Sequence, residues 1–286
     1  MSLSAGILAG IAAALCWGAA DFFAKIIVDK LGKGGDLKAL FWTRVAGLIP
    51  LVLLFAIMQP ALPSGVFPAL VLLGAIDFIA YYSFFRGVSK GEVSIVCPIS
   101  SAWGAVAVLI SFAFIGETLD ALRVFGIAAA VVGVMLTSTD LSRLRRGARL
   151  SNGATEALLA MLGWGIIWAL IGAWGKGIGW LAIIFGMRIV TSALIGGYAG
   201  ARKVRISSGI GAVALLILAG GMLDAIGYLF ASWGMGGELV SIVAPISATY
   251  PAVTVLLAAY LLREKLALNQ LIGVLAILAG VAALAA

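Results

Sequence analysis

The sequence predicts an all-α membrane protein in which ten transmembrane helices form two inverted five-helix repeats. Two observations predict this fold: a very apolar composition and an internal duplication. Of the 286 residues, 63% are hydrophobic and only 11% are charged, and the mean hydropathy is +1.18. Soluble domains carry about 25% charged residues. A lipid bilayer tolerates this composition, because apolar runs of about 20 residues can span it as helices.

A stretch of eight residues occurs twice and reveals the duplication. Residues 93–100 read VSIVCPIS, and residues 240–247, which lie 147 positions later, read VSIVAPIS. The second helix of each half matches at an offset of 144, which places Arg44 on Arg188. A register sustained over most of the chain indicates an internal repeat. The offset of 147 relates Trp17 to Trp164, Asp77 to Asp224, Tyr81 to Tyr228, Pro98 to Pro245 and Trp103 to Tyr250.

Charges, prolines and glycine clusters divide the chain into ten apolar segments. The first repeat comprises residues 1–139 and the second comprises residues 153–286, joined by a basic linker at 140–152. Because five is an odd number, the second repeat enters the membrane from the opposite side. Inverted repeats of this kind are typical of secondary transporters, whose substrate site lies near the bilayer midplane. The expected helices cover residues 3–28, 37–58, 65–87, 92–115, 120–139, 153–173, 178–200, 208–232, 239–262 and 267–285.

Lys and Arg are distributed unevenly between the loops on the two sides of the predicted bundle. The loops after odd-numbered helices hold fifteen of these residues, and the opposite side holds two. The positive-inside rule therefore places the odd-numbered loops in the cytoplasm and both termini outside. We expect a bacterial or archaeal cytoplasmic membrane. Loops facing anionic lipid account for the net charge of +7, so no nucleic-acid partner is expected.

The residues that are missing or isolated exclude several kinds of chemistry. The chain has no His, and Cys16 and Cys97 lie alone in apolar runs. We therefore expect no metal, no cofactor and no histidine-based catalysis, and the chain is not expected to be an enzyme. It also lacks a phosphate-binding GxxxxGK[ST] motif, which excludes a self-contained ATP pump. A polytopic enzyme acting on a lipid carrier is the alternative from another class.

Ionisable side chains inside apolar segments are functional candidates, because charge is costly in a bilayer. Depth along the predicted helices favours a pair between Arg44 and Asp77, and a symmetric pair between Arg188 and Asp224 nearer the outer side. Three interpretations stay open. The pairs are structural, or they form gates that open in turn, or one aspartate carries a proton, because an unpaired carboxylate in low dielectric binds a proton readily.

Asp21 is a fifth candidate and has no charged counterpart in the second repeat, where Trp168 occupies its position. Lys25 follows it by four residues. Residues at this spacing lie on one face of a helix, so an ion pair near the cytoplasmic end is the expected role of Asp21.

Repeat-related aromatic residues are expected to line a central cavity. Interfacial belts are the ordinary location of Trp and Tyr, but these positions lie well inside their segments. Such a cavity suits an amphipathic or aromatic small molecule, bordered by Ser100 and Ser247. Pro98 and Pro245 are expected to kink their helices, either as hinges or as packing shape. The six candidate cavity residues are Trp17, Trp164, Tyr81, Tyr228, Trp103 and Tyr250.

Several motifs resemble the drug/metabolite transporter superfamily, specifically its EamA-type ten-helix members. Tryptophan followed by glycine in the first helix of each half, and an arginine in each second helix, carry the resemblance. It covers essentially the whole chain. The further matching positions are Gly116–Leu119 (GETL) with Gly126 and Gly133, Arg263–Leu266 (REKL) with Gly273 and Gly280, and Tyr250–Leu256 (YPAVTVL).

The resemblance implies alternating-access transport of a small-molecule substrate. Amino-acid exporters are prominent among bacterial members, so we expect an exporter of amino acids or similar amphipathic compounds, with the proton as coupling ion. Nucleotide-sugar and drug carriers are the alternatives within the superfamily. Many members have basic residues in the N-terminal tail and termini inside, whereas this tail has none. Either the chain is inserted the other way or the charge count misleads. The oligomeric state stays open, with a monomer compatible.

Overall fold

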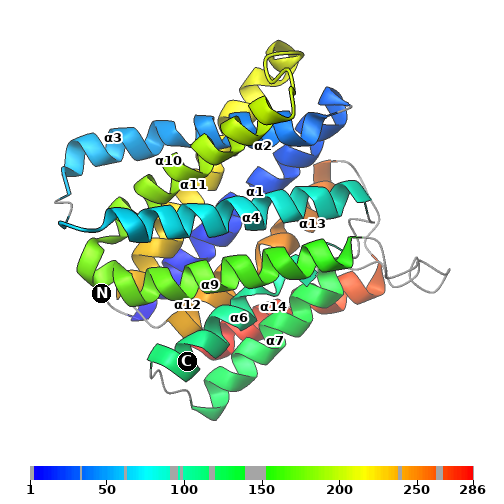
Figure 1. The fold of residues 1–286 in the computed structure, drawn as a ribbon. Coiled ribbons are helices and arrows are strands. Elements are labelled where there is room, and N and C mark those ends of the chain that lie inside the picture. Colours follow the sequence, from blue (N-terminus) through cyan, green and yellow to red (C-terminus); the bar gives the residue numbers. More distant parts are fainter. Residues whose placement is uncertain are drawn as a thin grey trace.

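The computed structural model consists of helices joined by turns, with no strand in the part of the chain that it describes (Figure 1). Each of the ten predicted ranges contains a helix. The structure describes residues 3–32, 34–60, 63–90, 96, 99–115, 120–138, 153–237, 240–261 and 267–285. The basic linker expected at 140–152 lies outside these residues.

Both repeats are built from long apolar helices. Among the described residues, seven segments are long and apolar enough to cross a membrane, and three shorter apolar helices occupy the fourth, fifth and tenth expected positions. The prediction of an all-α membrane protein is confirmed. The first repeat contains α1 (Leu3–Leu31), α2 (Gly35–Ala46), α3 (Leu48–Met58), α4 (Phe67–Lys90), α6 (Trp103–Ile110), a π-helical turn (Ser111–Ile115) and α7 (Ala121–Ser138). The second contains α9 (Ala154–Ile178), α10 (Trp180–Ala201), a 3₁₀ turn (Ile210–Val213), α11 (Ala214–Gly237), α12 (Val240–Ser247), α13 (Tyr250–Leu261) and α14 (Leu268–Ala285).

The second predicted helix, 37–58, is interrupted at Gly47, between α2 and α3. Pro50 explains the interruption, because it has no N–H to donate to the carbonyl of Ala46 four residues earlier. The glycine also allows close packing on α11, since a Cβ atom at Gly47 would lie 2.8 Å from the carbonyl oxygen of Gly221.

The ninth predicted helix is also divided. Pro245 lies inside α12, which ends at Ser247, and α13 begins at Tyr250. The first repeat has the same division, since α6 begins at Trp103, the repeat counterpart of Tyr250. Pro98 and most of the first copy of the duplicated stretch lie outside the described residues.

Contacts between α7 and α14 show that the repeats are inverted. A Cβ atom at Gly126 would lie 2.9 Å from the carbonyl oxygen of Gly280, and one at Gly133 would lie 2.7 Å from that of Gly273. The repeat offset maps each of these contacts onto the other with the helices exchanged. Only antiparallel helices related by a two-fold axis give this pattern. The pseudo-two-fold axis therefore passes between α7 and α14.

The remaining helices follow the same symmetry. α1 packs against α11 and α13, and their repeat counterparts α9, α4 and α6 make the equivalent contacts. Both termini lie at the same end of the bundle, on the left in Figure 1, as an even number of crossings requires. Large apolar side chains are exposed around the outside, including Ile57, Phe114 and Leu215. A bilayer covers such a surface.

The backbone contact between α7 and α14 predicts a destabilising effect of one methyl group. Gly133→Ala is expected to lower the melting temperature in detergent by several degrees, because overpacking costs about 1–3 kcal/mol. Gly197→Ala is the matched control in α10, since no described atom lies within 4 Å of a Cβ atom added there. Equal melting temperatures of the two variants would contradict the close approach.

Candidate functional site

A cavity of about 450 Å³ lies at the centre of the bundle. Its walls come from α1, α2, α4, α6, α9, α11 and α13, so both repeats contribute to it. All six aromatic residues predicted to surround a cavity are among the lining residues. The lining also includes Asp21, Asp36, Thr43, Arg44, Phe84, Phe85, Trp168, Asp224 and Thr254.

The aromatic side chains pack against one another as well as lining the cavity. Trp168 stacks between Trp103 and Tyr228, with ring centroids 5.7 Å and 5.1 Å away. Trp17 meets Trp103, Tyr228 and Tyr250 edge-on. Stacked and edge-on arrangements satisfy the charge distribution of aromatic rings, and they hold each ring in place. The cavity wall is therefore a fixed aromatic surface.

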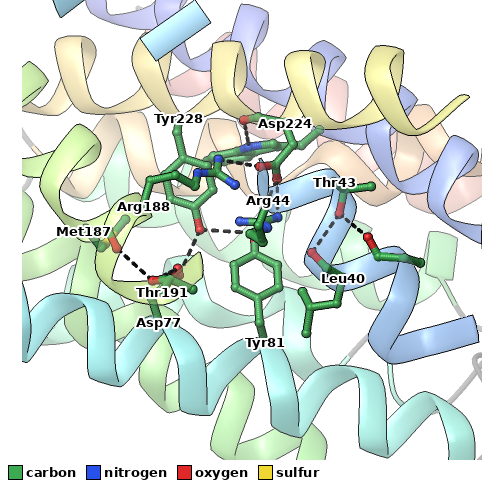
Figure 2. Close-up of polar contacts among 12 residues, drawn as sticks. Leu40, Thr43, Arg44, Asp77, Tyr81, Met187, Arg188, Thr191, Asp224 and Tyr228 are labelled. Atoms are coloured by element: carbon green, nitrogen blue, oxygen red, sulfur yellow. Dashed lines mark hydrogen bonds and ion pairs between the residues drawn. The ribbon is translucent and has the colours of Figure 1, made fainter. Parts of the chain in front are cut away.

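Two buried arginines converge on one aspartate at the edge of this cavity (Figure 2). Nη2 of Arg44 lies 2.9 Å from Oδ1 of Asp224, and Nη2 of Arg188 lies 2.6 Å from Oδ2 of the same residue. The predicted pair between Arg188 and Asp224 is present, but Arg44 pairs with Asp224 in place of Asp77. Depth alone could not separate the two aspartates, because all four side chains lie within a few residues of the middle of their membrane-crossing segments.

Asp77 is held by hydroxyl groups instead. Thr191 Oγ1 donates to Oδ2 of Asp77 at 2.8 Å, and the Tyr228 hydroxyl donates to Oδ1 at 3.4 Å (Figure 2). The Tyr81 hydroxyl makes the symmetric contact, 3.4 Å from Oδ1 of Asp224. The cluster is thus symmetric in its aspartates, tyrosines and arginines. It is asymmetric in bonding, because both arginines lie on the same aspartate.

Thr191 was not singled out from the sequence. Its repeat counterpart is Gly47, so the hydroxyl that Asp77 accepts from has no equivalent beside Asp224. The register does not single it out, because Thr43 and Met187, and Leu48 and Ser192, are neighbouring counterparts that also differ in polarity.

The repeat-related tryptophans in the first helix of each repeat, Trp17 and Trp164, also differ in their hydrogen bonding. Trp17 Nε1 donates to the backbone carbonyl of Asp224 at 3.1 Å. Trp164 is the counterpart of Trp17, and the symmetric bond would go to the carbonyl of Asp77. In the described part of the chain, however, the buried Nε1 of Trp164 has no acceptor. The indole and the arginines therefore all favour the same aspartate.

Comparison with known sequences agrees with this architecture. The profile of the EamA-like transporter family matches residues 4–139 and again residues 151–286. The chain belongs to this family. It is therefore an integral membrane protein that transports small molecules, and each profile match covers about one repeat.

One sequence relative of this EamA-like transporter and one solved structure with the same fold can be compared with it. An uncharacterised protein of the archaeon Methanocaldococcus jannaschii is 29% identical over 147 residues, which cover 48% of this chain and 98% of the relative. That protein is therefore about as long as one repeat. A solved crystal structure shares the fold, with a TM-score of 0.82 at 17% identity, over 99% of this chain and 98% of the other.

Not every predicted residue of this EamA-like transporter reaches the cavity. Ser100 and Ser247 are fully buried and are not among the lining residues. All eight residues of α12 are buried, and none of them is among the lining residues. Asp77 and Arg188 are buried within the charge cluster and do not line the cavity either. Asp21 does line it. The side chain of Lys25, its expected partner, lies outside the described set.

Proposed function

We propose that this chain is an alternating-access secondary transporter that exports amino acids or similar amphipathic metabolites from the cytoplasm, driven by protons. The observation that carries the proposal is the central cavity, which combines a fixed aromatic wall with charged groups. Small-molecule sites typically measure about 300–1,000 Å³ and are lined by apolar rings with a few polar groups. The cavity here, at about 450 Å³, has this size and composition.

The unequal bonding of two symmetric aspartates supports alternating access. An inverted repeat gives two facing states in which the halves exchange conformations. Because both arginines lie on Asp224 in one state, the exchanged state has both arginines on Asp77. The move keeps every buried charge paired, which matters because an unpaired buried charge costs several kcal/mol. The two aspartates then act as alternative seats for one pair of cations.

The same exchange accounts for the unpartnered indole of Trp164. In the exchanged state Trp164 donates to the carbonyl of Asp77, and Trp17 loses its bond to Asp224. A buried donor without an acceptor is unfavourable. Each state therefore leaves one indole unsatisfied, which keeps the two states close in free energy.

Proton coupling fits Asp77, the aspartate that pairs with neither arginine in this structure. Asp77 is buried and has only hydroxyl donors around it in the described residues. A carboxylate without a cationic partner in a low-dielectric site binds a proton readily. Asp77 and Asp224 would then carry the proton in turn, each in the state where it is not paired.

The cavity approaches one end of the bundle, where its lining includes Val28 near the end of α1 and Asp36 at the start of α2. The charge count places this end in the cytoplasm. The state described here is then inward-facing, ready to load an exported substrate. A reporter fused to the C-terminus tests the orientation, and a cytoplasmic reporter signal would reverse it.

Exchange of the indole bonds predicts opposite effects of two matched substitutions. Trp17→Phe should shift the equilibrium between facing states roughly fivefold away from the described one, because a net hydrogen bond contributes about 1 kcal/mol. Trp164→Phe should shift it the other way. The measurement is the ratio of maleimide labelling at Val28→Cys and at its counterpart Gly175→Cys, in a chain without native cysteines. Shifts in the same direction would contradict the exchange.

Transport itself is tested in proteoliposomes with a panel of radiolabelled amino acids and related metabolites, with and without a pH gradient. Saturable uptake that shows counterflow is the expected result. Flux without saturation would indicate a channel, and turnover of a lipid would indicate an enzyme. Asp77→Asn is expected to lose gradient-driven uptake and counterflow together, because the exchanged state needs this carboxylate to pair with both arginines. Normal gradient-driven uptake in both Asp77→Asn and Asp224→Asn would exclude proton coupling.

A further inference from the structure

The charges that line the central cavity do not balance. Asp21, Asp36, Arg44 and Asp224 are the charged residues of the described lining. Arg44 and Asp224 are paired with each other at 2.9 Å. Two carboxylates remain, so the cavity surface carries an excess of negative charge.

Asp36 lies at the mouth of the cavity. It borders a second hollow of about 500 Å³, whose lining also includes Arg86 and Arg202. Asp36 therefore shares this second hollow with two cationic side chains. Asp21 lies deeper, one turn of α1 beyond Trp17. No described side chain forms an ion pair or hydrogen bond with its carboxylate. Arg44 interacts with it electrostatically, but that guanidinium is held by Asp224.

Aromatic residues line the same cavity as this carboxylate. They include Trp17, Trp103, Trp168 and Tyr250. The face of an aromatic ring is negative, so it attracts cations, most strongly for tryptophan. A carboxylate and aromatic rings that line one cavity are a combination that can bind a substituted ammonium group.

The position of this acid breaks the repeat symmetry. The counterpart of Asp21 is Trp168, which also lines the cavity, and the counterpart of Asp36 is Trp180. The second repeat therefore supplies apolar aromatic surface where the first supplies negative charge.

We infer that Asp21 anchors the positively charged amino group of the substrate, and that the cavity selects amines and zwitterions over anions. The inference rests on the proposed function, because it places the transported molecule in this cavity. The ammonium donates hydrogen bonds to the Asp21 carboxylate, and the apolar part of the substrate lies against the tryptophan rings.

Three ligands on one carbon frame test the selectivity. They are 2-phenylethylammonium, phenylalanine and 3-phenylpropanoate, which present a cation, a zwitterion and an anion on the same phenyl group. Binding to the purified protein in detergent is measured by tryptophan fluorescence. The cation is expected to bind about tenfold or more tightly than the anion, because a charge-assisted hydrogen bond contributes that much. Equal affinities for the cation and the anion would overturn the inference.

Variants separate an anchor from a structural acid. Asp21→Asn should weaken 2-phenylethylammonium about tenfold or more and leave 3-phenylpropanoate unchanged or improved. Asp120→Asn removes an exposed carboxylate outside the cavity and should change neither affinity. Lys25→Gln tests the ion pair expected from the sequence. If Asp21 served only to pair with Lys25, then Asp21→Asn and Lys25→Gln would weaken all three ligands alike, and the inference would fail.

These experiments distinguish a failure of the Asp21 inference from a failure of the proposed transport function. If the cation binds in a way that depends on Asp21 but no counterflow is measured, the proposed transport function is wrong and the role of Asp21 as the amine anchor stands. If the anion shows counterflow that Asp21→Asn does not change, the proposed transport function stands and the role of Asp21 as the amine anchor is wrong. A misfolded Asp21→Asn variant is recognised by its melting temperature, and Asp21→Glu, which keeps the charge, is then expected to retain selectivity for the cation.

Discussion

Asp224→Asn is expected to destabilise the protein by about 3–5 kcal/mol and to abolish transport. The substitution removes the carboxylate that pairs with Arg44 and Arg188, so two buried guanidinium groups face only Asp77. Removing one partner of a buried ion pair costs this much because it leaves an uncompensated charge. Thermal unfolding in detergent, followed by size-exclusion chromatography, measures the stability, and counterflow in proteoliposomes measures transport.

Two control variants show that the effect comes from charge. Asp120→Asn breaks an ion pair with Arg123 whose aspartate side chain is 61% exposed, and surface pairs contribute about 0–1 kcal/mol. Its melting temperature should match that of the unmodified protein. Combining Asp224→Asn with Arg44→Met leaves one arginine and Asp77, which restores neutrality and should recover part of the lost stability. A double variant less stable than Asp224→Asn would contradict charge imbalance as the cause.

Trp168→Ala is expected to cost about 3–5 kcal/mol and to weaken binding of aromatic substrates. Only 2% of Trp168 is exposed, and its ring is stacked between two others, so truncation leaves a void beside the substrate cavity. The enlarged cavity loses its flat wall. Thermal unfolding and the dependence of counterflow on substrate size measure the two effects.

Trp233→Ala is the matched control for this truncation. Trp233 is 40% exposed on the outer surface of α11, so the same change of side chain creates no internal void. Its stability should fall much less, and its substrate preference should be unchanged. Equal losses in the two variants would show that Trp168 has no special role in the cavity wall.

Much of the fold follows from the sequence, because hydropathy and duplication both act over long stretches. Ten apolar segments and a register of 147 residues are robust to errors of a few residues at any helix end. The interruption at Gly47 was not predicted. It depends on Pro50 and on the close approach of α11, which is a tertiary contact that local pattern does not reveal.

The site was less accessible from the sequence. The six aromatic residues could be placed near a cavity because symmetry made them stand out, and their role in binding substrate is a proposal. Which arginine meets which aspartate could not be found, because depth along a helix does not give the direction of a side chain. Thr191 was missed for a related reason, since a single hydroxyl gives no signal in hydropathy.

The difference between Gly47 and Thr191 has a consequence for direction. Two identical halves joined in opposite senses would have facing states of equal free energy, and an empty carrier would rest in either one equally. A hydroxyl that stabilises Asp77 only while the arginines are on Asp224 removes this degeneracy. The two halves are joined in one chain that inserts in one orientation, so the bias always favours the same facing state. One side chain can thus set the resting state of the empty carrier.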